Sequence, residues 1–205
     1  MIKNNYPGKF IVFEGLDGSG RSSQMERVGE FLANNNFSVV LTKEPTQDSE
    51  AGRRIKQILQ EKIETDPMEL QKLYAQDREE HLENKVMPAL KEGKTVISDR
   101  YFFSTFAYGA AHGADLEELI KLNNDFLYPD IVFLFKASAK LCIERIEKRG
   151  SPKELFEKQE MLEKVWQVYE KLPLRFANFK IIDGEKSKDE VFQEIKNILL
   201  EELKI

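Results

Sequence analysis

The sequence predicts an α/β protein in which helices cover both faces of a five-stranded parallel sheet. Three observations favour this class: five short apolar runs, helical spacing of the apolar residues between them, and 205 residues without a linker-like stretch. Strands buried on both faces are continuously apolar, and right-handed crossovers place the connecting helices on the two faces. Since a domain usually has about 150 residues, we expect one domain over residues 1–205.

The first half of the chain supplies three of the five strands. Their apolar runs are KFIVFE at 9–14, FSVVLT at 37–42 and TVIS at 95–98. Apolar residues at helical spacing predict a helix over 22–36, directly after a glycine-rich turn. Asp66 and Pro67 have the order of an N-cap and a first helical residue, so they predict a long helix over 67–90 that ends before Gly93.

The second half supplies the other two strands, DIVFLF at 130–135 and FKIID at 179–183. We predict a polar helix near 115–126, helices over 138–148 and 154–172 that are separated by RGSP at 149–152, and an amphipathic helix over 187–203. Open parallel sheets bind their ligands at the carboxyl ends of the strands. We therefore expect the chemistry just after positions 14, 42, 98, 135 and 183.

Charge and composition exclude several classes of protein. The chain has 31 Lys and Arg against 36 Asp and Glu, a net charge of −5, whereas nucleic-acid-binding domains are usually basic. A single cysteine, Cys142, excludes a disulfide framework and a multi-Cys metal site. No apolar run approaches the roughly 20 residues of a membrane span. We expect a soluble, cytoplasmic protein that binds neither nucleic acid nor membrane.

A glycine-rich loop, GLDGSGRSS at 15–23, joins the first strand to the first helix. Its spacing is that of a phosphate-binding loop, in which backbone N–H groups and the helix N-terminus surround phosphate oxygens. A plain strand-to-helix turn is the alternative, but strand, loop and helix all agree with the phosphate loop. The expected phosphate-binding residues are Gly15, Gly18, Ser19, Gly20, Arg21, Ser22 and Ser23, and the Ser22 hydroxyl is the expected Mg²⁺ ligand.

Arg21 stands where lysine is usual in such loops. Arginine is a longer, planar fork that carries a permanent charge, so it binds phosphate with a different reach from lysine. The loop predicts nucleotide binding, and turnover depends on whether Arg21 can do the work of lysine.

Three further segments follow the loop: KEP at 43–45, a Tyr74/Arg78 pair on the long helix, and DRYFFSTFAY at 99–108. With the phosphate loop, and in this order, they resemble the thymidylate kinase family from about residue 10 to the final helix. The resemblance implies a three-layer P-loop kinase fold with a short lid segment at 148–156. It also implies a homodimer that uses ATP and Mg²⁺ to phosphorylate dTMP to dTDP.

The resemblance implies catalytic roles for Arg100, Asp17 and Arg21. Arg100 would bridge the donor and acceptor phosphates, and Asp17 would face the acceptor. Asp99 would join Ser22 at the metal. On the donor side, Gly184 would contact adenine, and either Arg149 or Lys153 of the lid would reach the phosphates of ATP.

On the acceptor side, the resemblance implies that Tyr74 stacks on the thymine and that Arg78 hydrogen-bonds its edge. Thr105 would add a polar contact to the base, and Tyr108 would crowd the 2′ position of the sugar. Lys43 would lie near the monophosphate, and we count Pro45 among the residues that bind substrate.

Each of these side chains also has a structural interpretation. Tyr74 fits simple core packing, Arg78 fits a solvated salt bridge on the helix, and Asp99 with Arg100 fits a structural ion pair. We expect Trp166 in the core, His81 on a solvated helix face and His112 in a loop.

Two segments depart from the family pattern. The lid lacks the usual Asp-Arg pair, and TQD at 46–48 replaces the usual Gly-Gly-Thr. The second departure leaves another pyrimidine monophosphate or a nucleoside open as acceptor. Arg21 and the altered lid leave open a nucleotide-binding protein without turnover.

Overall fold

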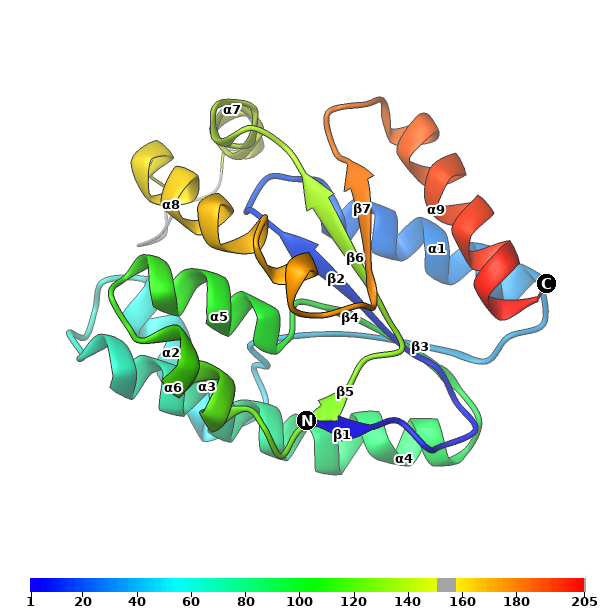
Figure 1. The fold of residues 1–205 in the computed structure, drawn as a ribbon, viewed down its shortest axis with the longest axis horizontal. Helices are drawn as coiled ribbons and strands as arrows, with labels where there is room; N and C mark the ends of the chain where they lie inside the picture. The colour runs from blue at the N-terminus through cyan, green and yellow to red at the C-terminus, as the bar shows by residue number, and fades with distance from the viewer. Residues whose placement is uncertain (151–157, 205) are drawn as a thin grey trace.

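The computed structural model describes residues 1–150 and 158–204. Its centre is a five-stranded, all-parallel sheet with the spatial order β3-β4-β2-β6-β7 (Figure 1). The strands are β2 Phe10–Gly15, β3 Val39–Lys43, β4 Thr95–Asp99, β6 Ile131–Lys136 and β7 Phe179–Asp183. The five-stranded parallel sheet expected from the apolar runs is therefore confirmed.

Helices cover both faces of this sheet, which gives the three layers of a P-loop kinase fold. On one face lie α1 Arg21–Asn34 and α9 Lys188–Leu203. The remaining helices are α2 Glu50–Leu59, α3 Pro67–His81, the π-helical η1 Leu82–Val86, α4 Met87–Lys91, α5 Phe102–Ala111, α6 Leu116–Leu122, α7 Ala139–Arg149, α8 Gln159–Tyr169 and the short 3-10 helix η2 Leu172–Leu174. A small second sheet pairs β1 Ile2–Lys3 with β5 Leu127–Tyr128.

Alternation along the central strand β2 divides the core into two clusters. Phe10 and Val12 pack on one face, and Ile11 and Phe13 pack on the other, because successive side chains of a strand point to opposite faces. All four are completely buried. This double burial explains why positions 10–13 are all apolar rather than apolar at alternate positions.

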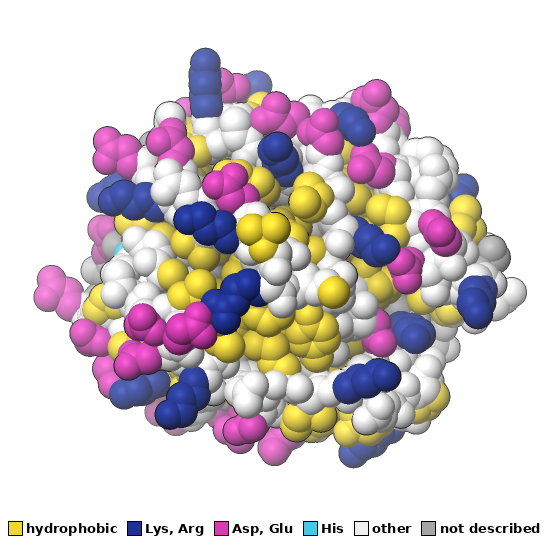
Figure 2. All heavy atoms as spheres, in the orientation of Figure 1, with side chains coloured by type: hydrophobic (Ala, Val, Ile, Leu, Met, Phe, Trp, Pro, Cys, Tyr) yellow, Lys and Arg dark blue, Asp and Glu magenta, His cyan; other side chains and the backbone are white. Residues whose placement is uncertain are grey.

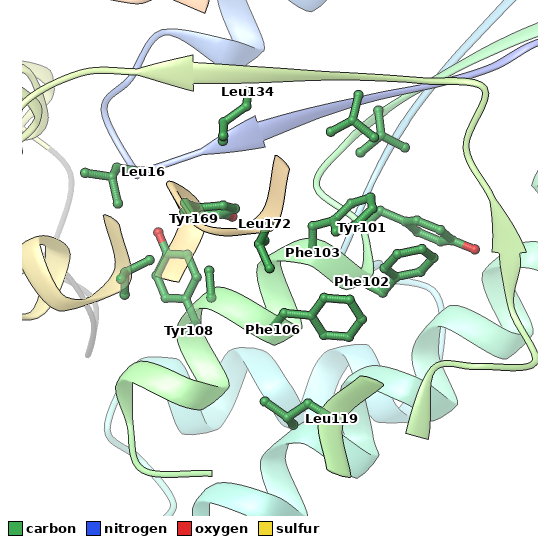
Figure 3. Close-up of a cluster of buried hydrophobic side chains, with 14 of the residues drawn as sticks. Leu16, Tyr101, Phe102, Phe103, Phe106, Tyr108, Leu119, Leu134, Tyr169 and Leu172 are labelled. Atoms are coloured by element: carbon green, nitrogen blue, oxygen red, sulfur yellow. The ribbon is translucent and has the colours of Figure 1, made fainter. Parts of the chain in front are cut away.

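An aromatic cluster fixes α5 against the sheet (Figure 3). Phe103 is completely buried and has four aromatic rings within 6 Å of its own ring centre, those of Phe102, Phe106, Phe176 and Phe179. Three of these contacts are edge-to-face, the arrangement that aromatic quadrupoles favour.

The order of the strands places the candidate site. The connection that leaves β2 runs to β3 at one edge of the sheet, whereas the connection that leaves the neighbouring strand β4 runs the other way, to β6. Such a divergence opens a crevice at the carboxyl edge of the sheet. The phosphate loop leaves β2 at this crevice, and the segment after Asp99 leaves β4 beside it.

The structure corrects several predicted boundaries. The helix predicted over 67–90 is two α-helical segments joined by the π-helical turn η1. Helices α2 and α5 were missed, although Ser49 caps α2 and Ile55, Ile58 and Leu59 have helical spacing. Helix α5 is buried on most of its surface, so its apolar residues show no helical periodicity. The predicted lid, 148–156, lies outside the described residues from 151 onward.

Among the described residues, no helix combines the length and apolar character that crossing a membrane requires. On the face seen in Figure 2, basic and acidic side chains are interspersed around apolar atoms. This mixture agrees with the nearly balanced count of charged residues.

We expect Phe103→Ala to lower the free energy of unfolding by about 3–5 kcal/mol, because it leaves a cavity among four aromatic rings. Leu174→Ala is the matched control, since Leu174 is 85% exposed and should change stability by less than about 0.5 kcal/mol. Urea denaturation of both variants measures the difference, and equal effects would contradict the packing described above.

Candidate active site

The loop between β2 and α1 has the backbone of an anion-binding turn. Gly15, Gly18 and Gly20 have φ of 144°, 83° and 99°, a region that other residues rarely occupy. A Cβ on Gly18 would also lie 2.4 Å from the carbonyl oxygen of Cys142. Gly20 is the N-cap of α1 and offers no side chain to the first N–H groups of the helix. These groups, with their positive dipole end, are arranged for a negatively charged ligand.

Two buried polar atoms in this loop have no hydrogen-bond partner in residues 1–150 and 158–204. They are Ser19 Oγ and Arg21 Nε. Because buried polar groups are usually hydrogen-bonded, orphans beside an anion-binding turn indicate that the turn is completed by a ligand. The loop therefore fits the phosphate groups of a nucleotide.

A cavity of about 530 Å³, here called the loop cavity, opens over this turn. Most of the residues predicted to bind ATP line it: Gly18, Ser19, Gly20, Arg21, Ser22, Ser23, Arg149 and Gly184, together with Asp17, Lys43, Asp99 and Arg100. Gly15 does not line the cavity but shapes the start of the turn. Lys153 lies outside the described residues.

Arg145 is a site residue for which we predicted no individual role from the sequence. It extends from α7 into the loop cavity and donates hydrogen bonds from Nη1 to Gly184 O at 2.9 Å and to Ser19 O at 3.4 Å. It thereby joins the phosphate loop to the segment that follows β7. Arg145 lies four residues before Arg149 and therefore on the same face of the helix, and this spacing could have indicated its place in the site.

Ser22 and Asp99, the predicted metal ligands, lie together. Ser22 Oγ donates to Asp99 Oδ2 at 2.6 Å, and Arg21 Nη1 forms an ion pair with Asp99 Oδ1. A hydroxyl and a carboxylate oxygen are hard ligands of the kind Mg²⁺ prefers, and Mg²⁺ usually takes its remaining ligands from phosphates and water. The donor set therefore fits this ion, and both roles stay predictions.

A second set of contacts joins the loop to the start of α5. Arg100 Nη2 donates to Asp17 Oδ1 at 2.5 Å and to Tyr108 Oη at 3.1 Å, and Tyr108 Oη donates to Asp17 Oδ2 at 2.8 Å. Arg21 Nη2 also lies 3.4 Å from Asp17 Oδ1. The structure thus brings together the three residues predicted to be catalytic.

Arg100 has a strained backbone. Its φ of 74° is unfavourable for a residue with a side chain, and such strain concentrates at functional sites. Two hydrogen bonds hold this conformation: Arg100 N donates to Phe13 O at 2.9 Å, and Ser98 Oγ donates to Arg100 O at 2.8 Å. The strained backbone directs the guanidinium towards Asp17 rather than into solvent.

Electrostatics at Asp17 favour the ionised carboxylate. Burial acts to raise its pKa, but the charges of Arg100 and Arg21, with hydrogen bonds from Arg100 and Tyr108, lower the pKa to about 2. Burial is also the largest influence on Arg100, and it opposes the charge; Asp17 more than compensates, so the pKa of Arg100 lies well above its ordinary value. Both groups are therefore charged at neutral pH.

Glu14, the last side chain before the loop, is completely buried. It accepts hydrogen bonds from the backbone N–H groups of Tyr101 and Ser104, at 2.9 and 3.1 Å. It also accepts them from the hydroxyls of Ser104 and Tyr169, at 2.6 and 2.8 Å. Burial raises the pKa of Glu14 despite these bonds and the charge of Arg100. Glu14 therefore holds the start of α5, a role that the apolar strand pattern concealed.

A smaller cavity of about 110 Å³, here called the small cavity, adjoins the loop cavity and shares Asp17, Glu44 and Arg100 with it. Its remaining lining is Pro45, Leu59, Gln71, Tyr74, Arg78, Tyr101, Ser104, Thr105 and Tyr108. Every residue predicted to bind the acceptor lines this cavity except Lys43, which lines the loop cavity.

Arg78 is buried and held by three partners. Its Nε donates to Glu44 Oε2 at 2.8 Å, Nη1 to Asn123 Oδ1 at 2.6 Å and Nη2 to Thr105 Oγ1 at 3.2 Å. The solvated salt bridge considered for Arg78 is therefore wrong, because this side chain is only 1% exposed. The guanidinium takes part in a network that crosses from α3 to α5 and to the end of α6.

His81 is also buried, contrary to the predicted solvated face. Its ring lies 2.7 Å from Thr42 Oγ1 and 3.0 Å from Glu44 Oε1. Being three residues after Arg78, it shares the helix face that packs against the end of β3. His112 follows the last residue of α5, as the loop prediction required, and Trp166 packs half-buried against the core.

The unusual segment 46–48 is fixed by a buried acid. Asp77 is 1% exposed and accepts hydrogen bonds from Thr46 N at 2.8 Å and Thr46 Oγ1 at 2.6 Å. It also accepts one from Ser49, whose hydroxyl caps α2. Thr46 thus makes a hydroxyl contact with Asp77 that a glycine at this position could not make.

A phosphate loop beside a second, smaller cavity, with an arginine at their junction, defines a nucleotide kinase of the P-loop class. The family profile described as "Thymidylate kinase" matches residues 13–195. The chain belongs to the thymidylate kinase family.

Several curated relatives resemble the chain over nearly its whole length. A protein of Pyrococcus horikoshii named probable thymidylate kinase is 38% identical over 201 residues, covering 96% of this chain and 98% of the relative. Another of that name, from Thermococcus kodakarensis, is 40% identical and covers 91% and 94%. A thymidylate kinase of Leptospira interrogans is 36% identical and covers 99% and 98%.

Asp17 should make the free energy of unfolding depend on pH. Its folded pKa of about 2 lies below the ordinary value of 3.8, so its contribution is present above pH 4 and is lost as the pH falls towards 2. Asp17→Asn removes this dependence. Urea unfolding between pH 2 and 6 should show a difference between wild type and variant that is constant above pH 4 and narrows below it. A difference that widens towards pH 2 would contradict the assignment.

Proposed function

We propose that this chain transfers the γ-phosphoryl group of ATP to the 5′-phosphate of dTMP, giving ADP and dTDP. An oxygen of the dTMP phosphate forms the new bond to the γ-phosphorus, and the bond from that phosphorus to the β–γ bridging oxygen breaks. The observation that carries this proposal is the position of Arg100 at the junction of the two cavities. No protein nucleophile is required, because a phosphate monoester is already a nucleophile, and catalysis rests on positioning and charge.

The donor would bind in the loop cavity. Backbone N–H groups at the start of α1 and the Ser19 hydroxyl would surround its phosphates, and Gly184 would border the adenine. Ser22 and Asp99 would hold Mg²⁺, which supplies neutralisation of phosphate charge when bound. The observed contacts of Arg21 with Asp99 and Asp17 keep its guanidinium directed into this cavity.

The acceptor would bind in the small cavity. Tyr74 would stack on the base, while Arg78 and Thr105, already joined by a hydrogen bond, would contact its polar edge. Tyr108 would border the sugar, where its bulk disfavours a 2′-hydroxyl. Lys43, with Pro45 beside it, would reach the 5′-phosphate from the edge of the loop cavity.

Arg100 and Asp17 carry opposite charges and would have different roles in the transfer. The guanidinium would stabilise the phosphate oxygens as charge develops during transfer. Asp17 would orient Arg100 before substrate arrives, through the 2.5 Å contact described above, and would face the acceptor itself. Because this pair is preformed, little reorganisation is needed when the substrates bind.

The proposal extends to the lid segment, the location of the protein and its assembly. Segment 148–156 would close over ATP, with Arg149 or Lys153 reaching the phosphates. We also propose one domain over residues 1–205, a cytoplasmic homodimer and no nucleic-acid partner; the net charge of −5 supports the last of these.

Coupled ADP formation with a panel of monophosphates tests the function. We expect turnover with dTMP to exceed that with AMP, CMP, GMP and UMP, and dUMP, dCMP and thymidine test the other acceptors that segment 46–48 leaves open. Preference for one of these would replace dTMP as the substrate. ATP binding with no transfer to any of them would mean that Arg21 does not replace lysine.

We expect Arg100→Ala to reduce kcat by about 10³-fold or more, because it removes charge stabilisation in the transition state. Arg175→Ala is the matched control, since Arg175 lies outside both cavities and pairs with Glu117. Steady-state kinetics with both substrates make the comparison. A change confined to KM would assign Arg100 to ground-state binding instead.

A further inference from the structure

Gln71 is a buried polar side chain for which the proposed roles give no use. It lies on α3, is only 2% exposed and lines the small cavity. Its Oε1 has no hydrogen-bond partner among the described residues. A buried amide oxygen without a partner destabilises the fold, so its presence beside a cavity indicates that a ligand completes it.

The position of Gln71 assigns it to the end of the cavity that would hold the base. It lies on the same helix as Tyr74, one turn earlier, and Arg78 follows Tyr74 by another turn. Helix α5 packs directly against the amide, because a Cβ built on Gly109 would lie 3.2 Å from Gln71 Cδ. Gly109 is four residues after Thr105 and therefore shares its face of α5. The amide thus lies between α3 and α5, beside the residues assigned to the base.

Several described polar groups at that end of the cavity already have partners, and Thr105 Oγ1 accepts a hydrogen bond from Arg78 Nη2. Arg78 is a donor only, and the carboxylate of Glu44 is engaged by Arg78 and His81. The hydroxyl of Tyr101 donates to Leu127 O at 3.0 Å. A pyrimidine-dione ring presents two carbonyl oxygens and one N–H donor, at N3. Arg78 complements the carbonyls, whereas the N–H group requires an acceptor.

We propose that Gln71 is a specificity-determining residue whose Oε1 accepts a hydrogen bond from N3–H of the acceptor's base. The inference rests on the proposed function, because it assumes a pyrimidine monophosphate in the small cavity. Thymine and uracil carry N3–H, whereas neutral cytosine has a bare acceptor nitrogen at that position. Gln71 therefore favours the dione bases over cytosine, and Tyr74 and Arg78 complete the recognition.

The test replaces Gln71 with leucine, which keeps the volume and removes both polar groups. Gln71→Met serves as a second variant of similar shape. Gln76→Leu is the matched control, because Gln76 is exposed on the same helix, where its Nε2 lies 3.5 Å from Glu80 Oε1. Calorimetry measures the affinity of each protein for dTMP and for dTMP methylated at N3, and thermal unfolding without ligand measures stability.

We expect Gln71→Leu to weaken dTMP binding about tenfold, the loss typical of one buried hydrogen bond, while KM for ATP stays unchanged. Methylation at N3 should weaken binding to the wild type by a similar factor, but should change binding to the variant much less. The midpoint of unfolding should not fall in the variant, because an unpartnered buried polar group has been removed. Gln76→Leu should behave as wild type throughout.

An equal penalty for N3-methylation in wild type and variant would overturn the assignment, as would lower stability with unchanged affinity for dTMP. These outcomes differ from failure of the proposed function. A wild type that prefers AMP or GMP in the turnover panel would contradict the function itself. A wild type that binds no pyrimidine monophosphate would overturn both proposals.

Discussion

The buried carboxylate of Glu14 is the interaction on which the rest of the site depends. The Glu14 side chain, at the end of β2, caps the start of α5 and accepts a hydrogen bond from the Tyr169 hydroxyl of α8. Its partner Ser104 also accepts a hydrogen bond from Arg100 Nη1 at 2.8 Å. The central strand, α5 and α8 are thus joined through one buried carboxyl group, beside the aromatic side chains seen in Figure 3. Such a network is stable only when every member is satisfied, so it specifies one arrangement of these three elements.

The charges around the loop cavity are paired before any substrate is present. Arg21 and Arg100 are matched by Asp17 and Asp99, so the two arginines are held within the crevice rather than extended into solvent. This pairing reconciles a net charge of −5 with anionic ligands, since recognition depends on local charge whereas net charge governs solubility and long-range steering. Arg21 also contributes a planar fork that contacts two carboxylates together, which the single ammonium of a lysine would do with different geometry.

The sequence predicted the central parallel sheet, the phosphate loop and most residues that line the two cavities. Those features are encoded locally: apolar runs, glycine spacing and short motifs at strand ends. It failed where burial depends on distant elements. His81 has the pattern of a solvated helix residue, but in the structure the end of β3 buries it. Arg78 has the pattern of a surface ion pair, but in the structure it is buried and bonded to Glu44 and Asn123. Helix α5 was missed because most of its residues are buried, so its apolar positions are not confined to one face.

The sequence by itself determined which chemical groups lie at the carboxyl edge of the sheet, because the glycines of the phosphate loop and the polar residues at the strand ends form short local patterns. Only the tertiary structure decided which groups are paired and which are left for a ligand. Glu14 with Tyr169, Glu44 with Arg78 and Asp77 with Thr46 join residues that are 155, 34 and 31 positions apart. The Oε1 atom of Gln71, which has no partner among the described residues, can be recognised only once α3 and α5 are packed. Hydrogen-bond satisfaction is a property of the whole fold, because a polar atom's partners are supplied by whichever elements surround it.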